Sequence, residues 1–210
     1  MATVDLVIET GKKRSFASAL DWPGWARSTS SHDDVLETLE RYRARYAAVL
    51  AASSLPTPVG RLTVREELVG DATTDFGAPS QIAERDHRAL RAPDRERLAS
   101  ILVACWSRFD EVASSAGELR TGPRGGGRQV EAMRRHVTDA EVAYARGLGL
   151  RVSSTNGEHA AIASLRERIA GVVEGTDAPE REGKWPLRYG IRRIAWHVCD
   201  HLFEIEDRER

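Results

Sequence analysis

Two histidines near the C-terminus, His197 and His201, have the spacing that most strongly indicates chemistry in this chain. Four residues make just over one turn of an α-helix, so a helix over residues 192–206 would project both imidazoles from one face. That face is also apolar, because Ile194 and Leu202 follow the three-and-four spacing of a buried stripe. Imidazoles directed into a core need partners for their ring nitrogens. The pair therefore predicts either a metal site or ordinary core histidines bonded to carboxylates or carbonyls.

A third candidate ligand, His136, lies in a separate helical pattern over residues 129–148. It follows Met133 by three residues and precedes Ala140 by four, so it borders the inward face of that helix. Side chains on facing helices of a bundle can converge on one interior point. Three nitrogen ligands would leave open positions for water or substrate, as catalytic sites require. Neutral imidazoles suit zinc, nickel, copper or ferrous iron, and the ligand type alone does not choose among them.

Other polar residues near these histidines have different expected roles. Four carboxylates close in sequence could orient the imidazoles: Asp139, Glu141, Asp200 and Glu204. Three further histidines are expected to lie in solvated or helix-capping positions: His32, His87 and His159. Cys199 lies next to the pair, but its position on the helix favours packing over ligation.

The elements that would position these residues divide the chain in two. Strand-like patterns occupy residues 4–9, 15–20 and 62–69, and a helix capped by Ser31 or Asp33 is expected to continue through Ala51. Amphipathic helical patterns follow, with expected bounds of 94–113, 129–148, 158–174 and 186–207. The fold class is therefore α+β, with a small sheet-and-helix module over residues 1–78 and a four-helix bundle over residues 79–210. The segment 72–82 between them could be a hinge or a docked strand.

Bulk properties exclude several functions. The 31 basic and 32 acidic residues nearly cancel and are spread along the chain, so we expect neither nucleic acid nor a membrane surface as a partner. The longest apolar run is too short to span a bilayer, and the N-terminus lacks the apolar block of a signal peptide. Cys105 and Cys199 are interpreted as buried thiols in a reducing compartment. These features predict a cytoplasmic protein.

The helical part resembles the DinB-like superfamily of metal-binding four-helix bundles. The resemblance rests on RRHVTDAEVAYARGLG (residues 134–149) and on WPLRYGIRRIAWHVCDHLFEIEDR (residues 185–208). It implies an up-down bundle and a divalent metal (zinc, nickel or iron) bound by His136, His197 and His201. Some relatives are transferases or isomerases that use a low-molecular-weight thiol such as mycothiol or bacillithiol, and many bundles of this type form homodimers. The resemblance leaves the small-molecule substrate unknown.

The N-terminal part is similar to the HicB antitoxin fold, through FASALDWPGWARSTSSHDDVLETLERY (residues 16–42). In that fold a strand leads to a D-x-P-G turn, here Asp21, Pro23 and Gly24, and then to a second short strand and a helix. HicB proteins use this module to bind a small toxin ribonuclease and often carry a DNA-binding domain. No such DNA-binding domain follows here, so the similarity implies an α+β module without implying antitoxin function.

Three function hypotheses follow. The first is a metal-dependent enzyme of the thiol-dependent transferase type, with His136, His197 and His201 as metal ligands and catalytic residues unknown. The second is a non-enzymatic module in which the HicB-like part binds a protein partner and the bundle is a scaffold. A metal-binding stress-response protein without turnover is a third.

Two other features have ordinary explanations beside functional ones. The glycine-rich loop 125–127, flanked by Arg120, Arg124 and Arg128, could hold an anion at the start of the following helix, or could simply connect two helices. Four tryptophans could line an apolar pocket or pack in the core: Trp22, Trp25, Trp185 and Trp196.

Overall fold

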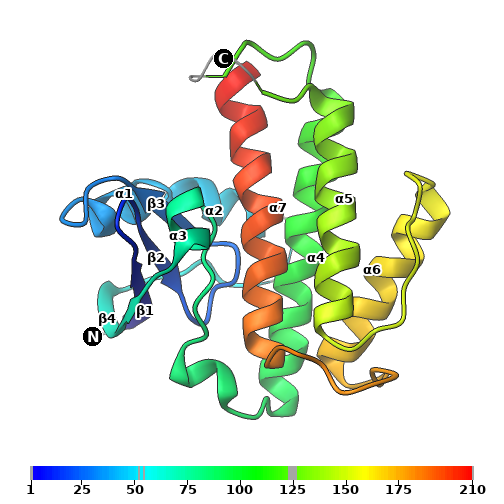
Figure 1. Ribbon diagram of the computed structural model, residues 1–210, viewed down its shortest axis with the longest axis horizontal. Helices are drawn as coiled ribbons and strands as arrows, with labels where there is room; N and C mark the ends of the chain where they lie inside the picture. The colour runs from blue at the N-terminus through cyan, green and yellow to red at the C-terminus, as the bar shows by residue number, and fades with distance from the viewer. Residues whose placement is uncertain (1, 52, 54, 123–126, 210) are drawn as a thin grey trace.

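The structure is a computed structural model that describes residues 2–51, 53, 55–122 and 127–209. It has a mixed α+β fold, in which a small four-stranded sheet at the N-terminus is followed by a helical region. In Figure 1 the sheet lies to the left of the C-terminal helix α7 (Leu187–Glu209), and the other long helices lie to its right. The expected α+β class is confirmed.

The sheet has the strand order β3-β2-β1-β4, with β1 pairing antiparallel to β2, β2 antiparallel to β3, and β1 parallel to β4. The strand bounds are Thr3–Thr10 (β1), Ser15–Ala19 (β2), Ala26–Thr29 (β3) and Arg61–Val69 (β4). The three strands expected from the sequence are confirmed, each bound lying within one residue of its prediction. A parallel pair needs a crossover connection, and the helices between β3 and β4 supply it.

The β2–β3 turn contains Gly24, which has a φ of +96° and lies against the helical region. A Cβ at this position would lie 2.8 Å from the sulfur of Cys199 and 3.2 Å from that of Cys105. The turn therefore requires glycine twice over, for its left-handed backbone and for its close approach to two helices.

Gly24→Ala is expected to destabilise the chain by about 1–3 kcal/mol, because the new methyl group combines backbone strain with overpacking. The free energy of unfolding from urea titration measures this effect. Gly117→Ala is the matched control, since a Cβ there would meet nothing within 4 Å. Equal stabilities of the two variants would show that the turn does not pack as described.

The prediction of a single helix from Ser31 or Asp33 through Ala51 is wrong. The structure has α1 at Val35–Arg41 and α2 at Arg43–Leu50, and the N-cap residue Asp34 makes no side-chain cap hydrogen bond. Tyr42 forms the break, since its amide bonds to the Leu39 carbonyl three residues earlier. The Tyr42 ring lies edge-on against Phe203 of α7, with centroids 5.2 Å apart. Packing against α7 thus overrides the local preference for one continuous helix.

The segment 72–82 is docked, and in place of a strand it contains the short helix α3 at Ala72–Phe76. The side chain of Asp71 caps this helix by accepting from the amides of Thr73 and Thr74. Further along, the buried carboxylate of Glu9 in β1 accepts hydrogen bonds from the amides of Ser80 and Gln81. These bonds attach the segment to β1, one of the two inner strands of the sheet. A 3₁₀ turn, η1 at Glu84–His87, then leads to the long helices.

The four long helices form where the sequence predicts them. Their bounds are Ala92–Ser115 (α4), Val130–Gly147 (α5), His159–Glu174 (α6) and Leu187–Glu209 (α7). Helices α4 and α5 each pack against both α6 and α7 (Figure 1). Within the described ranges, no helix is long and apolar enough to cross a membrane.

Sheet and helices share a hydrophobic core. Buried side chains of the sheet module, such as Leu6 and Trp25, belong to the same cluster as Leu102 of α4 and Val198 of α7. Ion pairs reinforce this contact, for example between Arg27 and Asp200, whose N···O distance is 2.9 Å. The predicted domain boundary between residues 78 and 79 stays a prediction. The shared core and the ion pairs hold α7 in a defined position against the sheet.

Candidate metal centre

Three histidines from two helices converge between α5 and α7. His136 comes from α5, and His197 and His201 come from α7. One ligand atom of each side chain lies within 4.8 Å of the others, and the Nε2 atoms of His136 and His197 are 3.2 Å apart. The three ring centroids are 4.7–4.9 Å apart. The predicted convergence of these residues is therefore present in the structure.

The helices place the histidines at the edge of the core and not at its centre. His197 and His201 are 7 % and 9 % exposed, whereas His136 is half-buried. The three imidazoles thus form a cluster with one more accessible member. The partial exposure of His136 would allow a small molecule to reach the cluster.

Burial and nearby charge favour neutral imidazoles in this cluster. Burial lowers the pKa of His136, and the charges of His201 and Arg128 lower it further. Burial also holds the pKa of His197 well below its ordinary value, with His201 and His136 acting in the same direction. A metal binds the deprotonated nitrogen, so at neutral pH these two side chains need lose no proton before binding.

The donor set fits a divalent metal. Zinc–nitrogen bonds of about 2.0–2.1 Å at a tetrahedral angle put two nitrogens about 3.3–3.4 Å apart. The separation of 3.2 Å between His136 Nε2 and His197 Nε2 is close to that value. Two neutral imidazoles whose Nε2 atoms face each other can otherwise form one hydrogen bond, with one nitrogen as the donor.

One carboxylate orients a member of the cluster. Glu204 lies 3.0 Å from His201 Nδ1, so it can accept the hydrogen of that nitrogen and leave Nε2 free for a metal. The hydrogen bond from His201 is the main reason that the pKa of Glu204 is lowered. Arg208 also donates to Glu204 at 2.9 Å. In contrast, His197 Nδ1 is buried with no partner among the described residues.

Glu204→Gln is expected to weaken zinc binding about 10- to 100-fold, because the imidazole of His201 loses its charged acceptor while the side chain keeps its shape. Competition with a chromophoric chelator measures the change in Kd. Glu131→Gln is the control, since Glu131 is exposed on α5, is not among the main causes of the pKa shifts of the histidines and should leave the affinity unchanged. Equal affinities of wild type and Glu204→Gln would exclude a role for this carboxylate in metal binding.

The other carboxylates predicted to orient the histidines lie elsewhere. Asp139 is exposed, and Asp200 pairs with Arg27 of β3. Glu141 is buried and pairs with Arg166 of α6, with an N···O distance of 3.0 Å.

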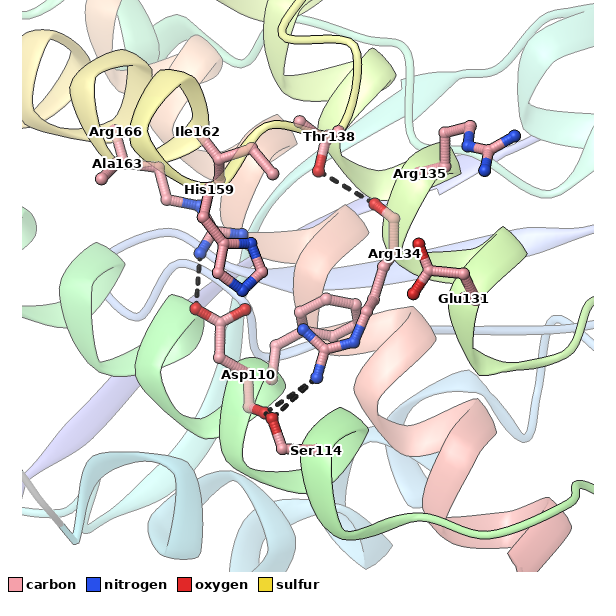
Figure 2. A pocket seen from close by; sticks show the side chains of 12 residues that line it. Asp110, Ser114, Glu131, Arg134, Arg135, Thr138, His159, Ile162, Ala163 and Arg166 are labelled. Atoms are coloured by element: carbon pink, nitrogen blue, oxygen red, sulfur yellow. Dashed lines mark hydrogen bonds and ion pairs between the residues drawn. The ribbon is translucent and has the colours of Figure 1, made fainter.

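Arg166 also borders a hollow of about 400 Å³ between α4, α5 and α6. Figure 2 shows its guanidinium pointing toward Asp110, at an N···O distance of 2.7 Å. His159 lies beside this ion pair in the view and is exposed, as its sequence context predicts. This network lies on the side of α5 that faces α4 and α6, and it does not include the three histidines.

No protein-family model, curated protein or solved structure matches this chain. The DinB-like and HicB-like resemblances therefore stay predictions from the sequence. The convergence of the histidines rests on geometry alone.

Two residues beside the cluster were not identified as site residues from the sequence. The Tyr144 ring lies 5.8 Å from the His197 ring, centroid to centroid, and Arg193 lies over the Tyr144 ring at 5.3 Å. Arg193 also donates to the Tyr144 hydroxyl at 3.4 Å. Spacing could have revealed both, since Arg193 precedes His197 by four residues and Tyr144 follows His136 by eight.

The remaining predicted residues take structural positions. Cys105 and Cys199 are free and buried, with sulfurs 3.5 Å apart in the core, so Cys199 is not a ligand of the cluster. His87 and His32 are exposed, and His32 lies within hydrogen-bond distance of two hydroxyls on β1 and β2. Residues 123–126 lie outside the described ranges, and with them most of the proposed anion-binding loop.

The tryptophans divide between core and surface. Trp25 and Trp196 are buried, whereas Trp22 and Trp185 are partly exposed. The Trp196 ring lies 5.7 Å from the His197 ring, and the Trp185 ring lies 5.6 Å from that of Tyr144. Trp196 therefore borders the histidine cluster, Trp185 contacts Tyr144 beside it, and Trp25 packs in the core.

Proposed function

We propose that this chain is a divalent-metal-binding protein of DinB-like type, and that its three-histidine centre serves a thiol-dependent transferase reaction. The observation that carries the proposal is the placement of one nitrogen each from His136, His197 and His201 within 4.8 Å. The proposal includes the finer fold, an up-down four-helix bundle formed by α4 to α7 after a HicB-like module. Zinc, nickel and iron are the candidate metals, and cytoplasm is the proposed location.

A divalent ion held by three imidazoles would supply Lewis acidity, which lowers the pKa of a thiol or water bound to it. The chain's own residues complete the site. Glu204 fixes the ring of His201 through its Nδ1. Burial raises the pKa of the Tyr144 hydroxyl, so this group stays protonated at neutral pH and can donate a hydrogen bond to developing negative charge.

In the proposed transfer, the thiol sulfur forms a bond to an electrophilic carbon of the substrate. The leaving group departs with the electron pair of its bond, and the thiol proton passes to water. The low-molecular-weight thiol is the co-substrate that the DinB-like resemblance implies.

The reaction is tested with N-acetylcysteine and 1-chloro-2,4-dinitrobenzene, whose substitution product is coloured. Wild-type protein loaded with zinc, nickel or ferrous iron should accelerate product formation, and His197→Ala should not. His159→Ala should match the wild type, because this histidine is exposed and outside the cluster. No acceleration with any of the three metals would refute the thiol-transferase part of the proposal.

A second candidate function is a protein-binding module, and one observation favours it. Strand β4 is nine residues long and lies at the edge of the sheet, where a partner could add a strand. Co-purification from the native host distinguishes the two proposals. A stoichiometric small basic protein bound to metal-free chain would favour the binding module, whereas metal-loaded chain without such a protein would favour the enzyme.

A further inference from the structure

A second hollow, of about 600 Å³, lies between the sheet module and α7, and is also lined by Gly122 and Gly127 from the connection between α4 and α5. We call it the Arg14 cleft, and the lining residues used in the argument are Arg14, Arg27, Phe76, Asp200, Glu204 and Arg208. It combines segments that are far apart in the sequence, because the β1–β2 turn, β3 and α3 all face α7 here.

The cleft is linked to the candidate metal centre by one side chain. Glu204 lines the cleft and lies 3.0 Å from Nδ1 of His201. On α7, Asp200 and Glu204 lie three residues after His197 and His201 respectively, so cleft and cluster occupy adjoining strips of the same helix. None of the three histidines is among the described residues that line the cleft, so a molecule bound there would reach the cluster through Glu204.

Most charges in the cleft neutralise each other. Arg27 pairs with Asp200 at 2.9 Å, and Arg208 pairs with Glu204 at the same distance. A third lining carboxylate, that of Asp207, pairs with Arg45 at 2.8 Å.

Arg14 is the exception among the lining cations. No described carboxylate forms an ion pair with its guanidinium. The cleft thus has one unpaired positive charge among its described residues.

An exposed aromatic ring lines the same cleft as this charge. Phe76 is 86 % exposed and lines the cleft. The next residue, Gly77, lies near Arg14, since a Cβ built on Gly77 would lie 4.0 Å from Arg14 Nε. An unpaired guanidinium and an exposed ring in one cleft match a ligand that has a carboxylate and an apolar group.

We propose that the Arg14 cleft binds a small carboxylate with an apolar part, with Arg14 holding the carboxylate and Phe76 packing on the apolar group. That the cleft is the substrate site of the metal centre rests on the proposed function. That it binds a carboxylate rests on the cleft alone.

The test measures binding of 3-phenylpropanoate by isothermal titration calorimetry, with its uncharged amide as the matched ligand. Arg14→Gln should weaken binding of the carboxylate at least about tenfold, as expected for loss of a charge-assisted hydrogen bond, and should not affect the amide. Lys12→Gln, on the same turn but outside the cleft, should leave both affinities unchanged. Phe76→Ala should weaken both ligands.

Each measurement is made on metal-loaded wild type and on metal-free His197→Ala, so that the two proposals can fail separately. Arg14-dependent binding to both proteins supports the cleft, and it does so even if the wild type binds no metal and the enzyme proposal falls. Binding that needs the metal and ignores Arg14→Gln would overturn the cleft while leaving the metal centre. Absence of binding, or equal binding of inorganic phosphate, would also overturn it.

Discussion

Zinc is expected to raise the melting temperature of the wild-type chain and to leave that of His197→Ala unchanged. A ligand that binds only the folded state stabilises it by about 2.7 kcal/mol when its free concentration is 100 times Kd. For a domain of this size, that corresponds to a rise of roughly 5–10 °C. The effect requires all three imidazoles, because two nitrogens from a single helix turn form a much weaker site than three from two helices. Thermal unfolding followed by circular dichroism, with and without zinc, measures it.

Two further variants make this result specific. His136→Ala changes a half-buried side chain on the other helix and should abolish the zinc response with a smaller effect on the apoprotein. His159→Ala removes an exposed histidine of α6 and should keep the full response. An undiminished zinc response in His136→Ala would place the bound metal elsewhere.

Asp86→Ala is expected to destabilise the chain by about 3–5 kcal/mol, because it leaves a buried guanidinium without its partner. The side chains of Asp86 and Arg192 are 2 % and 7 % exposed. Arg192 Nε donates to Asp86 at 3.0 Å, and the amide of Ala83 donates to the same carboxylate at 2.9 Å. The pair joins η1 to α7, so its loss also removes a contact that positions the histidine helix.

Urea denaturation monitored by circular dichroism gives the free energies of unfolding. Glu37→Ala is the matched control, because its ion pair with Arg41 is largely exposed and should contribute no more than about 1 kcal/mol. Replacing Asp86 and Arg192 together by apolar residues should restore part of the stability. A loss below 1 kcal/mol for Asp86→Ala would show that Arg192 finds water or another partner.

The sequence is sufficient to predict the elements whose burial follows a regular period. The stripe of α7 that includes Ile194, Val198 and Leu202 is fully buried, and the same period places His197 and His201 at its edge. The helical period of α5 places His136 at the edge of the buried face in the same way. The long helices and three strands are predictable for this reason, because each side chain's position depends only on its own element.

Features that depend on contacts between distant segments are not predictable in this way. The break at Tyr42 exists because its ring packs against Phe203, which lies 161 residues away in the sequence. The choice of Glu204 over Glu141 as the partner of a histidine depends on how each helix is rotated in the fold. The unpaired charge of Arg14 in the cleft also depends on the fold, because the fold brings the β1–β2 turn to α7 and pairs the other lining arginines with carboxylates.

The most direct test of the central claim is elemental metal analysis of untagged protein purified without chelator, beside the His136→Ala and His197→Ala variants. The three-histidine centre predicts near-stoichiometric zinc, nickel or iron in the wild type and its loss from both variants, with unchanged circular dichroism spectra. Wild-type protein that contains no divalent metal and takes up none when metal ions are added would contradict the claim. The three histidines would then be core residues, and the protein-binding module would become the leading proposal.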